Sequence, residues 1–500
     1  MKSLFNHKIL IIVFGSLLFA ACKKQLDIQP RQSIDFNTAL TNSTGIEAAI
    51  AGIYGSLRDQ TQYGRDKLAL SDALSDITLA TGKSGRLQPE NRNTLNAHFA
   101  AWTSSYYYIN QINLVLDAIP NISDATSATK DRWEGEMKFL RALLFQDLAK
   151  IYAYDTTAII PSQYKGNVVL SLTGIKTADQ AQNSRLPRAS TKSVYDAIYA
   201  DLNTAIAKLG NNPRNVSGGA QVYYANKAAA HALLCRAALH YGDWATVITQ
   251  ATNALSNASG VDASLQTAAN YVAGWRSTRN PESLFEVRFA IQNENLGVNV
   301  SLQTSYTTLA ALGAPTGATG GFGDLVPNNF LLSQLGITSS GYPNITRGPD
   351  VRAQLYEWGT AGRGTRFIEC TKFFGKSGFP NLDNVPVLRI PELYLNRAEA
   401  YYRSGNQPLA LADLNTILTK RGLASVSLSD TALLNEILRQ KMLEYAFEGY
   451  RWFDLKRNGM DVNKTYIGLA LIPFNDKRIL PPIPRSEIDG NPNIQQNPGY

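Results

Sequence analysis

The sequence predicts a mostly α protein: a scaffold of tetratricopeptide-like helical hairpins with long loop-rich insertions and a few short strands. Two similar segments carry this prediction. Residues 227–255 read KAAAHALLCRAALHYGDWATVITQATNAL, and residues 391–418 read PELYLNRAEAYYRSGNQPLALADLNTIL. In each, a helix with many small residues leads through a glycine-containing turn into a second helix. Such hairpins stack and bury a shared core, although the spacing here is looser than the strict tetratricopeptide period of about 34 residues.

Three further helices are predicted by apolar residues that recur at three- and four-residue steps. The first starts at a capping box formed by Thr44 and Glu47. The second runs from Trp133 to Ile151, and the third has Ser190 or Thr191 as its N-cap. These helices extend the scaffold towards the N-terminus.

The segment between the two hairpins has a different composition, because residues 262–384 are rich in Gly, Asn, Thr and Ser. Two runs within it, SLFEVRFA (283–290) and RFIECTKFF (366–374), alternate apolar and polar residues as strands do. Long loops on an ordered scaffold commonly carry function. We therefore expect one domain over residues 38–500, with a helical scaffold at 38–261 and 385–500 and a loop-rich ligand-binding region at 262–384.

The N-terminus has the three parts of a secretory signal. A short basic region carries Lys2 and Lys8, and an apolar stretch of eleven residues follows at 9–19. That stretch is too short to span a bilayer as a helix, which takes about 20 residues. Two alanines then precede Cys22.

A cysteine at this place is typical of a lipoprotein signal, because its thiol receives the lipid. We expect a signal peptide at 1–21, acyl chains such as palmitate on Cys22, and a polar tether at 22–37. The alternative is a chance cysteine beside an ordinary cleavage site. The two other cysteines either pair or stay free, and Cys235 lies in a helical apolar pattern that favours a core position.

Charge and motifs argue against nucleic-acid binding and catalysis. The 48 basic and 40 acidic residues are interspersed, with no Lys/Arg block of the kind that nucleic-acid binding needs. His98, His231 and His240 form no metal-binding motif. The glycine-rich stretches 313–324 and 359–367 lack the residues of a phosphate or dinucleotide loop. We expect no metal, no cofactor and no nucleic-acid partner.

Two pairs of carboxylates are spaced by one helical turn. They are Asp72 with Asp76, and Glu444 with Glu448, the latter close to Arg451. We interpret both pairs as salt-bridged helix faces rather than as the acid and nucleophile of a glycosidase. The sequence therefore indicates no catalytic residue.

The chain is rich in aromatic residues, with 24 Tyr, 18 Phe and 6 Trp. Aromatic faces stack on the apolar face of a pyranose ring, and polar side chains bond its hydroxyls. Ligand-binding aromatics are expected in loops or at a helix start, although core packing is the alternative for each. The candidates are Trp102, Trp275, Tyr306, Phe322, Tyr342 and Trp358.

Four stretches carry a resemblance to a known family. They are CKKQLDIQP after the proposed signal, EMKFLRALLFQDLAKIY (136–152), LEYAFEGYRWFDLKRNG (443–459) and LPPIPRSEIDGNPNIQQNPGY (480–500). Together they resemble the SusD/RagB family of outer-membrane lipoproteins, the third through the EGxRWxDLxR signature and the fourth through the C-terminal sequence of the family. One departure is Gln440-Lys441, where the family usually has Glu-Arg. These motifs belong to the scaffold, so no ligand residue is carried over from the family.

The resemblance implies a non-catalytic protein on the cell surface, anchored in the outer membrane by lipid and facing the exterior. Such proteins bind oligosaccharide nutrients and deliver them to a SusC-like TonB-dependent transporter. Peptide or other cargo for the same transporter is one alternative. A surface glycoside hydrolase and a helical scaffold that binds only proteins are two others.

Overall fold

The computed structural model describes residues 39–500 apart from residues 212, 316 and 318. The predicted signal peptide 1–21, the acylation site Cys22 and the tether 22–37 lie outside the described residues. Within residues 39–500, apart from those three gaps, no helix is both long enough and apolar enough to cross a membrane.

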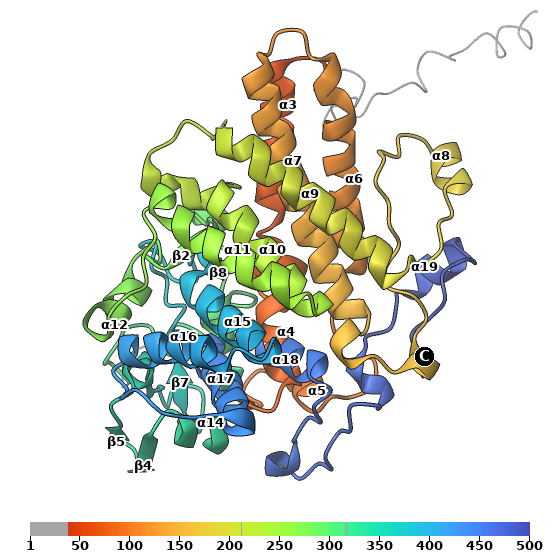
Figure 1. Cartoon of the computed structure of the whole chain (residues 1–500). Helices are drawn as coiled ribbons and strands as arrows, with labels where there is room; N and C mark the ends of the chain where they lie inside the picture. Colours follow the sequence, from red (N-terminus) through yellow and green to blue (C-terminus); the bar gives the residue numbers. More distant parts are fainter. Residues whose placement is uncertain (1–38, 212, 316, 318) are drawn as a thin grey trace, which may run out of the picture.

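Long helices form most of the molecule, and neighbours in the chain usually pack side by side (Figure 1). They are α3 (Ser43–Ser56), α6 (Trp102–Ala118), α7 (Ser127–Tyr152), α9 (Thr191–Asn211), α10 (Lys227–Tyr241), α11 (Trp244–Asn257), α15 (Ile390–Arg403), α16 (Gln407–Lys420) and α17 (Asp430–Tyr445). The packing runs from α3 through α6, α7, α9, α10 and α11 to α15 and α16. The predicted mostly helical fold is confirmed.

Both predicted hairpins are present, as α10–α11 and α15–α16. Gly242 and Gly405 make the turns with φ of 79° and 80°, a left-handed conformation that favours glycine. Small residues of α10, including Ala229 and Ala237, are fully buried, which lets neighbouring helices approach closely. The hairpin pattern thus predicted both the helices and their close packing.

The start of α3 differs from the prediction. Asn42 caps the helix, its side-chain oxygen accepting a hydrogen bond from the Gly45 amide at 2.9 Å. Glu47 is instead engaged by α7, where the Trp133 indole donates to Glu47 Oε1 at 2.7 Å. The capping box of Thr44 and Glu47 was therefore wrong, because a tertiary contact takes the glutamate.

Shorter helices join or cap the long ones. They are α4 (Asp66–Leu74), α5 (Gln88–Asn91), α8 (Ala178–Asn183), α12 (Ala268–Arg276), α13 (Leu302–Tyr306), α14 (Asn329–Gln334), α18 (Arg451–Arg457) and α19 (Arg485–Gly490). The C-terminal segment that carries α19 packs over the body. Asn497 Nδ2 donates to the Tyr152 carbonyl at 3.1 Å, which ties the chain end to α7.

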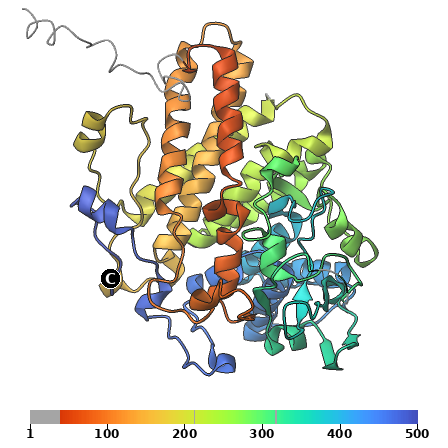
Figure 2. The same ribbon diagram turned by 180° about the vertical axis from the view of Figure 1, so that it is seen from behind.

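The described strands form four antiparallel pairs of two strands each. They are β1 (Thr78–Ala80) with β3 (Leu325–Pro327), β2 (Ser283–Val287) with β8 (Val385–Arg389), β4 (Ile337–Gly341) with β5 (Asn344–Arg347), and β6 (Tyr356–Trp358) with β7 (Ile368–Cys370). β2 and β7 confirm the two alternating runs, at shorter length. The β4–β5 hairpin lies at the lower end of the molecule in both views, and α3 lies at the upper end (Figures 1 and 2).

Buried ion pairs tie β8 and the end of α16 to α17. Glu444 Oε1 lies 3.0 Å from Arg389 Nη1, and Glu444 Oε2 lies 2.8 Å from Arg421 Nε. Glu282 contacts the same two arginines at 2.9 and 3.0 Å. Glu448 contacts Arg389 at 2.8 Å. The salt-bridge interpretation of Glu444 and Glu448 is confirmed, but Glu448 lies beyond the end of α17.

The other two carboxylates, Asp72 and Asp76, have different partners. Asp76 forms a two-bond ion pair with Arg451, which joins the start of α18 to the segment after α4. Asp72 is buried and accepts a hydrogen bond from the Tyr306 hydroxyl at 2.9 Å. Both aspartates are structural in this fold.

The histidines and the two remaining cysteines are also structural. His231 contacts Gln250, and His240 contacts Asp155 at 2.7 Å. Cys235 and Cys370 are buried and free. No group of three or more His, Cys, Asp or Glu that could hold a metal occurs among the residues that the structure describes.

Candidate functional site

An open groove with a volume of about 690 Å³ lies between α14, the β4–β5 hairpin and the β6–β7 pair. Its apolar lining residues are Leu79, Pro327, Leu332, Ile337, Trp358, Phe367, Ile368 and Tyr466. Its polar lining residues are Asn328, Asn329, Ser333, Thr338, Ser339 and Arg366. The groove therefore combines aromatic surface with short polar side chains, as ligand sites for sugars require.

Trp358 lines this groove, and Tyr342 lies beside it, next to the lining residue Gly341. Their ring centroids are 6.0 Å apart and the rings are nearly perpendicular, at 85°. Tyr342 is 41% exposed, and Trp358 is half-buried. The guanidinium carbon of Arg366 lies 4.0 Å from the centre of the Tyr342 ring. Two of the predicted ligand-binding aromatics, distant in sequence, are thus brought together here.

Backbone pairing and side-chain anchors fix the positions of these two rings. Trp358 ends β6, where it pairs with Ile368 of β7. Tyr342 lies in the tight turn between β4 and β5. Arg347 at the end of β5 donates to the Ala353 carbonyl at 3.1 Å, which holds the hairpin against the segment before β6.

Two polar side chains in the groove have no hydrogen-bond partner among the described residues. Asn329 and Thr338 are exposed and make no side-chain hydrogen bond with any other described residue. Asn328 is engaged instead, because its side chain donates to the Asp76 carbonyl and caps α14. Asn329 and Thr338 are therefore free to bond a ligand in the groove.

Tyr466 lies on the far side of the groove, in a segment close to the C-terminus. Its hydroxyl donates to the Thr78 carbonyl at 2.6 Å. Burial raises the pKa of the Tyr466 hydroxyl well above its usual range, so the group stays protonated. Lys464 beside it is buried, and burial lowers the pKa of its ammonium group to about 7.

Two family profiles match the chain. The one described as the SusD family matches residues 375–500, and the one described as starch-binding and associating with the outer membrane matches residues 23–239. Together the two matches cover more than half of the chain. The chain belongs to the SusD family.

Relatives with established names agree with this assignment. SusD-like protein P38 of Formosa agariphila is 22% identical over the whole of both chains. The starch-binding protein SusD of Bacteroides thetaiotaomicron is 34% identical over 131 residues, which are 24% of this chain and 22% of that protein. Similarity to a SusD-like protein thus extends over the full length of the chain.

Solved structures share the fold. A SusD superfamily protein from Bacteroides thetaiotaomicron superposes with a TM-score of 0.76 at 24% identity, covering 92% of this chain and 100% of the other. A laminarin-binding SusD-like protein superposes with a TM-score of 0.69 at 22% identity, with the same coverage. The tetratricopeptide-like scaffold is therefore that of SusD proteins.

In this SusD-family protein, three of the six candidate aromatics lie in the core. Trp102, Trp275 and Tyr306 are at most 1% exposed. Trp102 stacks edge-on against Tyr152 of α7, and Tyr306 packs against Phe447. Because their faces are covered by protein, they are outside the groove and are left out of the ligand surface proposed below.

Phe322 is half-buried and also lies outside the groove lining. Two guanidinium groups contact its ring, those of Arg86 at 4.3 Å and Arg363 at 3.7 Å from the ring centre. The ring is therefore already in contact with protein. Phe322 is likewise left out of the proposed surface.

Sequence reasoning missed several groove residues. Tyr466 and Leu79 are far from the loop-rich region in sequence, and no local pattern marks them. Arg366 and Phe367 begin the run RFIECTKFF (366–374), which was interpreted as a strand but not as part of a ligand site. The alternation of side chains along that strand is the signal that could have placed Arg366 on the same face as the lining residue Ile368.

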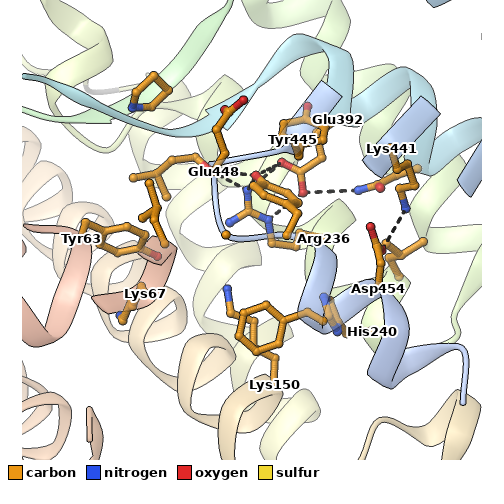
Figure 3. A pocket seen from close by; sticks show the side chains of 18 residues that line it. Tyr63, Lys67, Lys150, Arg236, His240, Glu392, Lys441, Tyr445, Glu448 and Asp454 are labelled. Carbon is orange, nitrogen blue, oxygen red and sulfur yellow. Dashed lines mark hydrogen bonds and ion pairs between the residues drawn. The ribbon is translucent and has the colours of Figure 1, made fainter. Parts of the chain in front are cut away.

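A second, smaller cavity lies in the core (Figure 3). Its volume is about 40 Å³, enough for a few water molecules and too small for a sugar. Arg236 points towards Glu392 with an Nε–Oε1 distance of 2.7 Å, and Lys441 points towards Asp454 at 3.8 Å (Figure 3). These charges neutralise one another, so the cavity belongs to the core ion pairs.

Proposed function

We propose that this SusD-family protein binds oligosaccharide nutrients in the groove that Trp358 lines and that Tyr342 adjoins. The observation that carries the proposal is the pairing of two accessible aromatic rings with the uncommitted polar side chains Asn329 and Thr338. Aromatic rings contribute affinity through stacking, while hydrogen bonds to hydroxyls orient the sugar. The starch-binding relative and the laminarin-binding structural neighbour support a glycan as the ligand class.

A glycoside hydrolase is not favoured by this groove. Hydrolysis of a glycosidic bond needs two carboxylates on opposite sides of the bond. Within the described chain, no Asp or Glu lines the groove. Binding without turnover is therefore the activity that we propose, with peptides as the alternative cargo.

Isothermal titration calorimetry against a panel of neutral and acidic oligosaccharides and short peptides tests the ligand class. We expect binding of at least one oligosaccharide, with no change in the sugar afterwards by mass spectrometry. Binding of peptides alone would replace the glycan by the alternative cargo. Release of shorter sugars by purified protein would contradict the non-catalytic assignment.

We further propose that Cys22 carries the lipid that anchors the protein in the outer membrane, facing outwards. The family description supports outer-membrane association. Labelled palmitate supplied to growing cells should enter the wild-type protein and not a Cys22→Ala variant, and protease added to intact cells should digest the anchored protein. Unlabelled wild-type protein, or label that survives the substitution, would contradict this assignment.

Delivery to a SusC-like TonB-dependent transporter completes the proposal. Mild detergent extraction followed by affinity purification of this protein should recover such a transporter in a defined ratio. Cells without the transporter should still bind the glycan but not take it up. Uptake that proceeds equally well without this protein would contradict a role in delivery.

A further inference from the structure

We propose that the groove selects a glycan that carries negative charge, as a carboxylate or a sulfate ester, and that Arg366 is the residue that contacts this charge. The inference rests on the proposed function and specifies its substrate class. It follows from the charges around the groove and from the way in which Arg366 is held.

Arg366 is the only charged side chain that lines the groove, counting the residues described by the structure. Its Nη1 donates to the carbonyl oxygens of Pro315 at 2.7 Å and Gly359 at 2.9 Å. Guanidinium has five N–H donors. The donors on Nε and Nη2 have no hydrogen-bond partner among the described residues, so this edge is available to a ligand.

No carboxylate balances the charge of Arg366 in the part of the chain described here. Arg389 and Arg421 in the core are paired with Glu282 and Glu444, whereas buried Arg188 is bonded to main-chain and amide oxygens alone. An arginine that is half-buried without a carboxylate leaves a positive potential at the groove. An anionic ligand would supply the negative charge that no described carboxylate places beside Arg366.

The two nearest carboxylates on β6 and β7 are engaged elsewhere. Glu357 adjoins Trp358, and strand alternation directs it to the opposite face of β6. There it accepts a hydrogen bond from the Gly313 amide at 2.8 Å. Glu369 is buried, where it accepts hydrogen bonds from Thr308 and contacts Lys83.

The Arg366 guanidinium lies over the Tyr342 ring, 4.0 Å from its centre, and this contact helps to position it beside the groove. Trp358 contacts the same tyrosine ring from another side. A sugar ring near Trp358 therefore places a charged substituent within reach of Arg366. A planar guanidinium binds a carboxylate or a sulfate ester through two parallel hydrogen bonds, which a neutral hydroxyl cannot match.

Calorimetry with three sets of oligosaccharides tests the inference: neutral glucans, galacturonate oligomers and sulfated galactans. We expect one of the two anionic sets to bind more tightly than the neutral set, and added salt to weaken only the anionic binding. The set that binds distinguishes carboxylate from sulfate. Equal or tighter binding of neutral glucans would overturn this inference and leave the proposed function intact, whereas failure of every glycan would overturn both.

Substitutions assign the charge contact. Arg366→Gln should weaken anionic binding by about tenfold to a hundredfold and leave any neutral binding unchanged. Arg366→Lys keeps the positive charge but not the planar guanidinium. Its affinity for anionic glycans should lie between those of the wild type and of Arg366→Gln, which gives a second test if Arg366→Gln folds poorly.

Arg363→Gln is the matched control, because Arg363 lies on the same loop and stacks on an aromatic ring but does not line the groove. We expect this variant to bind anionic glycans as the wild type does. An equal loss in the Arg363 and Arg366 variants would overturn the assignment, since it would report only the net charge of the loop. A loss of neutral and anionic binding alike in Arg366→Gln would overturn it as well.

Discussion

The indole N–H of Trp358 donates a hydrogen bond to the main-chain oxygen of Asn344 at 3.3 Å. This bond joins β6 to the β4–β5 hairpin, whose turn carries Tyr342. The hydrogen bond therefore helps to fix the positions of the two rings relative to each other. A ligand meets a preformed aromatic edge and does not have to assemble it, which lowers the entropy cost of binding.

Removal of either ring should weaken glycan binding. We expect Trp358→Ala and Tyr342→Ala each to cost about 0.5–1.5 kcal/mol, by analogy with aromatic pairs, which is roughly a 2- to 13-fold rise in Kd. Tyr107→Ala is the control, because Tyr107 is 62% exposed on α6, away from the groove. Calorimetric Kd values that are unchanged in both groove variants, or equally changed in the control, would show that the binding site lies elsewhere.

Neutralising Glu444 should destabilise the protein strongly. Arg389, Arg421 and Arg352 all approach this fully buried carboxylate. Glu444→Gln leaves them short of one negative charge, and breaking a buried pair in this way costs about 3–5 kcal/mol. Urea unfolding measures the change. Asp196→Asn breaks the exposed pair with Lys192 and should leave the free energy of unfolding almost unchanged, because water screens exposed ion pairs. Similar losses in both variants would contradict the role of the network.

The ion pair between Arg451 and Asp76 should show a measurable coupling energy. Its two hydrogen bonds, each 2.7 Å long, join segments 375 residues apart in the sequence. A double-mutant cycle with Arg451→Met and Asp76→Asn should give a coupling of about 1–3 kcal/mol in urea unfolding. Strictly additive effects would show that the signature arginine stabilises the fold through packing alone.

Asp72 should make stability fall as the pH rises above about 4. Burial raises the pKa of this carboxyl to about 8, against about 3.9 in an unfolded chain. In that interval the folded state binds the extra proton, so its stability decreases with increasing pH. Because each pKa unit corresponds to about 1.4 kcal/mol, Asp72→Asn should raise the free energy of unfolding at pH 8 by about 2 kcal/mol or more.

The comparison is made between urea unfolding curves of the two proteins at pH 4 and at pH 8. Histidine titration is common to both proteins and cancels in the difference. Asp489→Asn, on an exposed side chain, serves as the control. A difference between wild type and Asp72→Asn that is the same at both pH values would rule out the titration of Asp72 as its cause.

Cys235 and Cys370 should be unreactive in the folded protein. Both are fully buried, and burial raises the pKa of each thiol to about 12. In a Cys22→Ser variant, a thiol reagent at pH 8 should label neither cysteine until denaturant is added, and then both. Rapid labelling of the native protein would reveal local opening around α10 or β7.

Local patterns predicted the scaffold well because their physical causes are local. The period of apolar residues and the glycine turns at Gly242 and Gly405 depend only on neighbouring residues. The cap of α3 was mispredicted because Glu47 is taken by Trp133, a partner 86 residues away. The sequence predicted that Glu444 forms an ion pair, but not that Arg389 is a partner, because the two residues come from distant segments.

The groove could be predicted only in part. Tyr342 and Trp358 were chosen as aromatics in a loop-rich region, and so were Trp275 and Tyr306, which the core encloses. The difference lies in tertiary packing: Trp275 lies on α12 and its ring packs against Phe373. Sequence composition marks the loop-rich region, but not which of its rings face outwards.

The β4–β5 hairpin, which contributes to the groove lining, and α3 lie at opposite ends of the body (Figures 1 and 2). With Cys22 acylated as proposed, this hairpin would lie at the end of an upright protein that is farther from the lipid headgroups. The sixteen residues from Cys22 to Asn37 reach at most about 55 Å when fully extended. Glycans dissolved in the medium would therefore reach the elements that line the groove without first entering the space between the body and the bilayer.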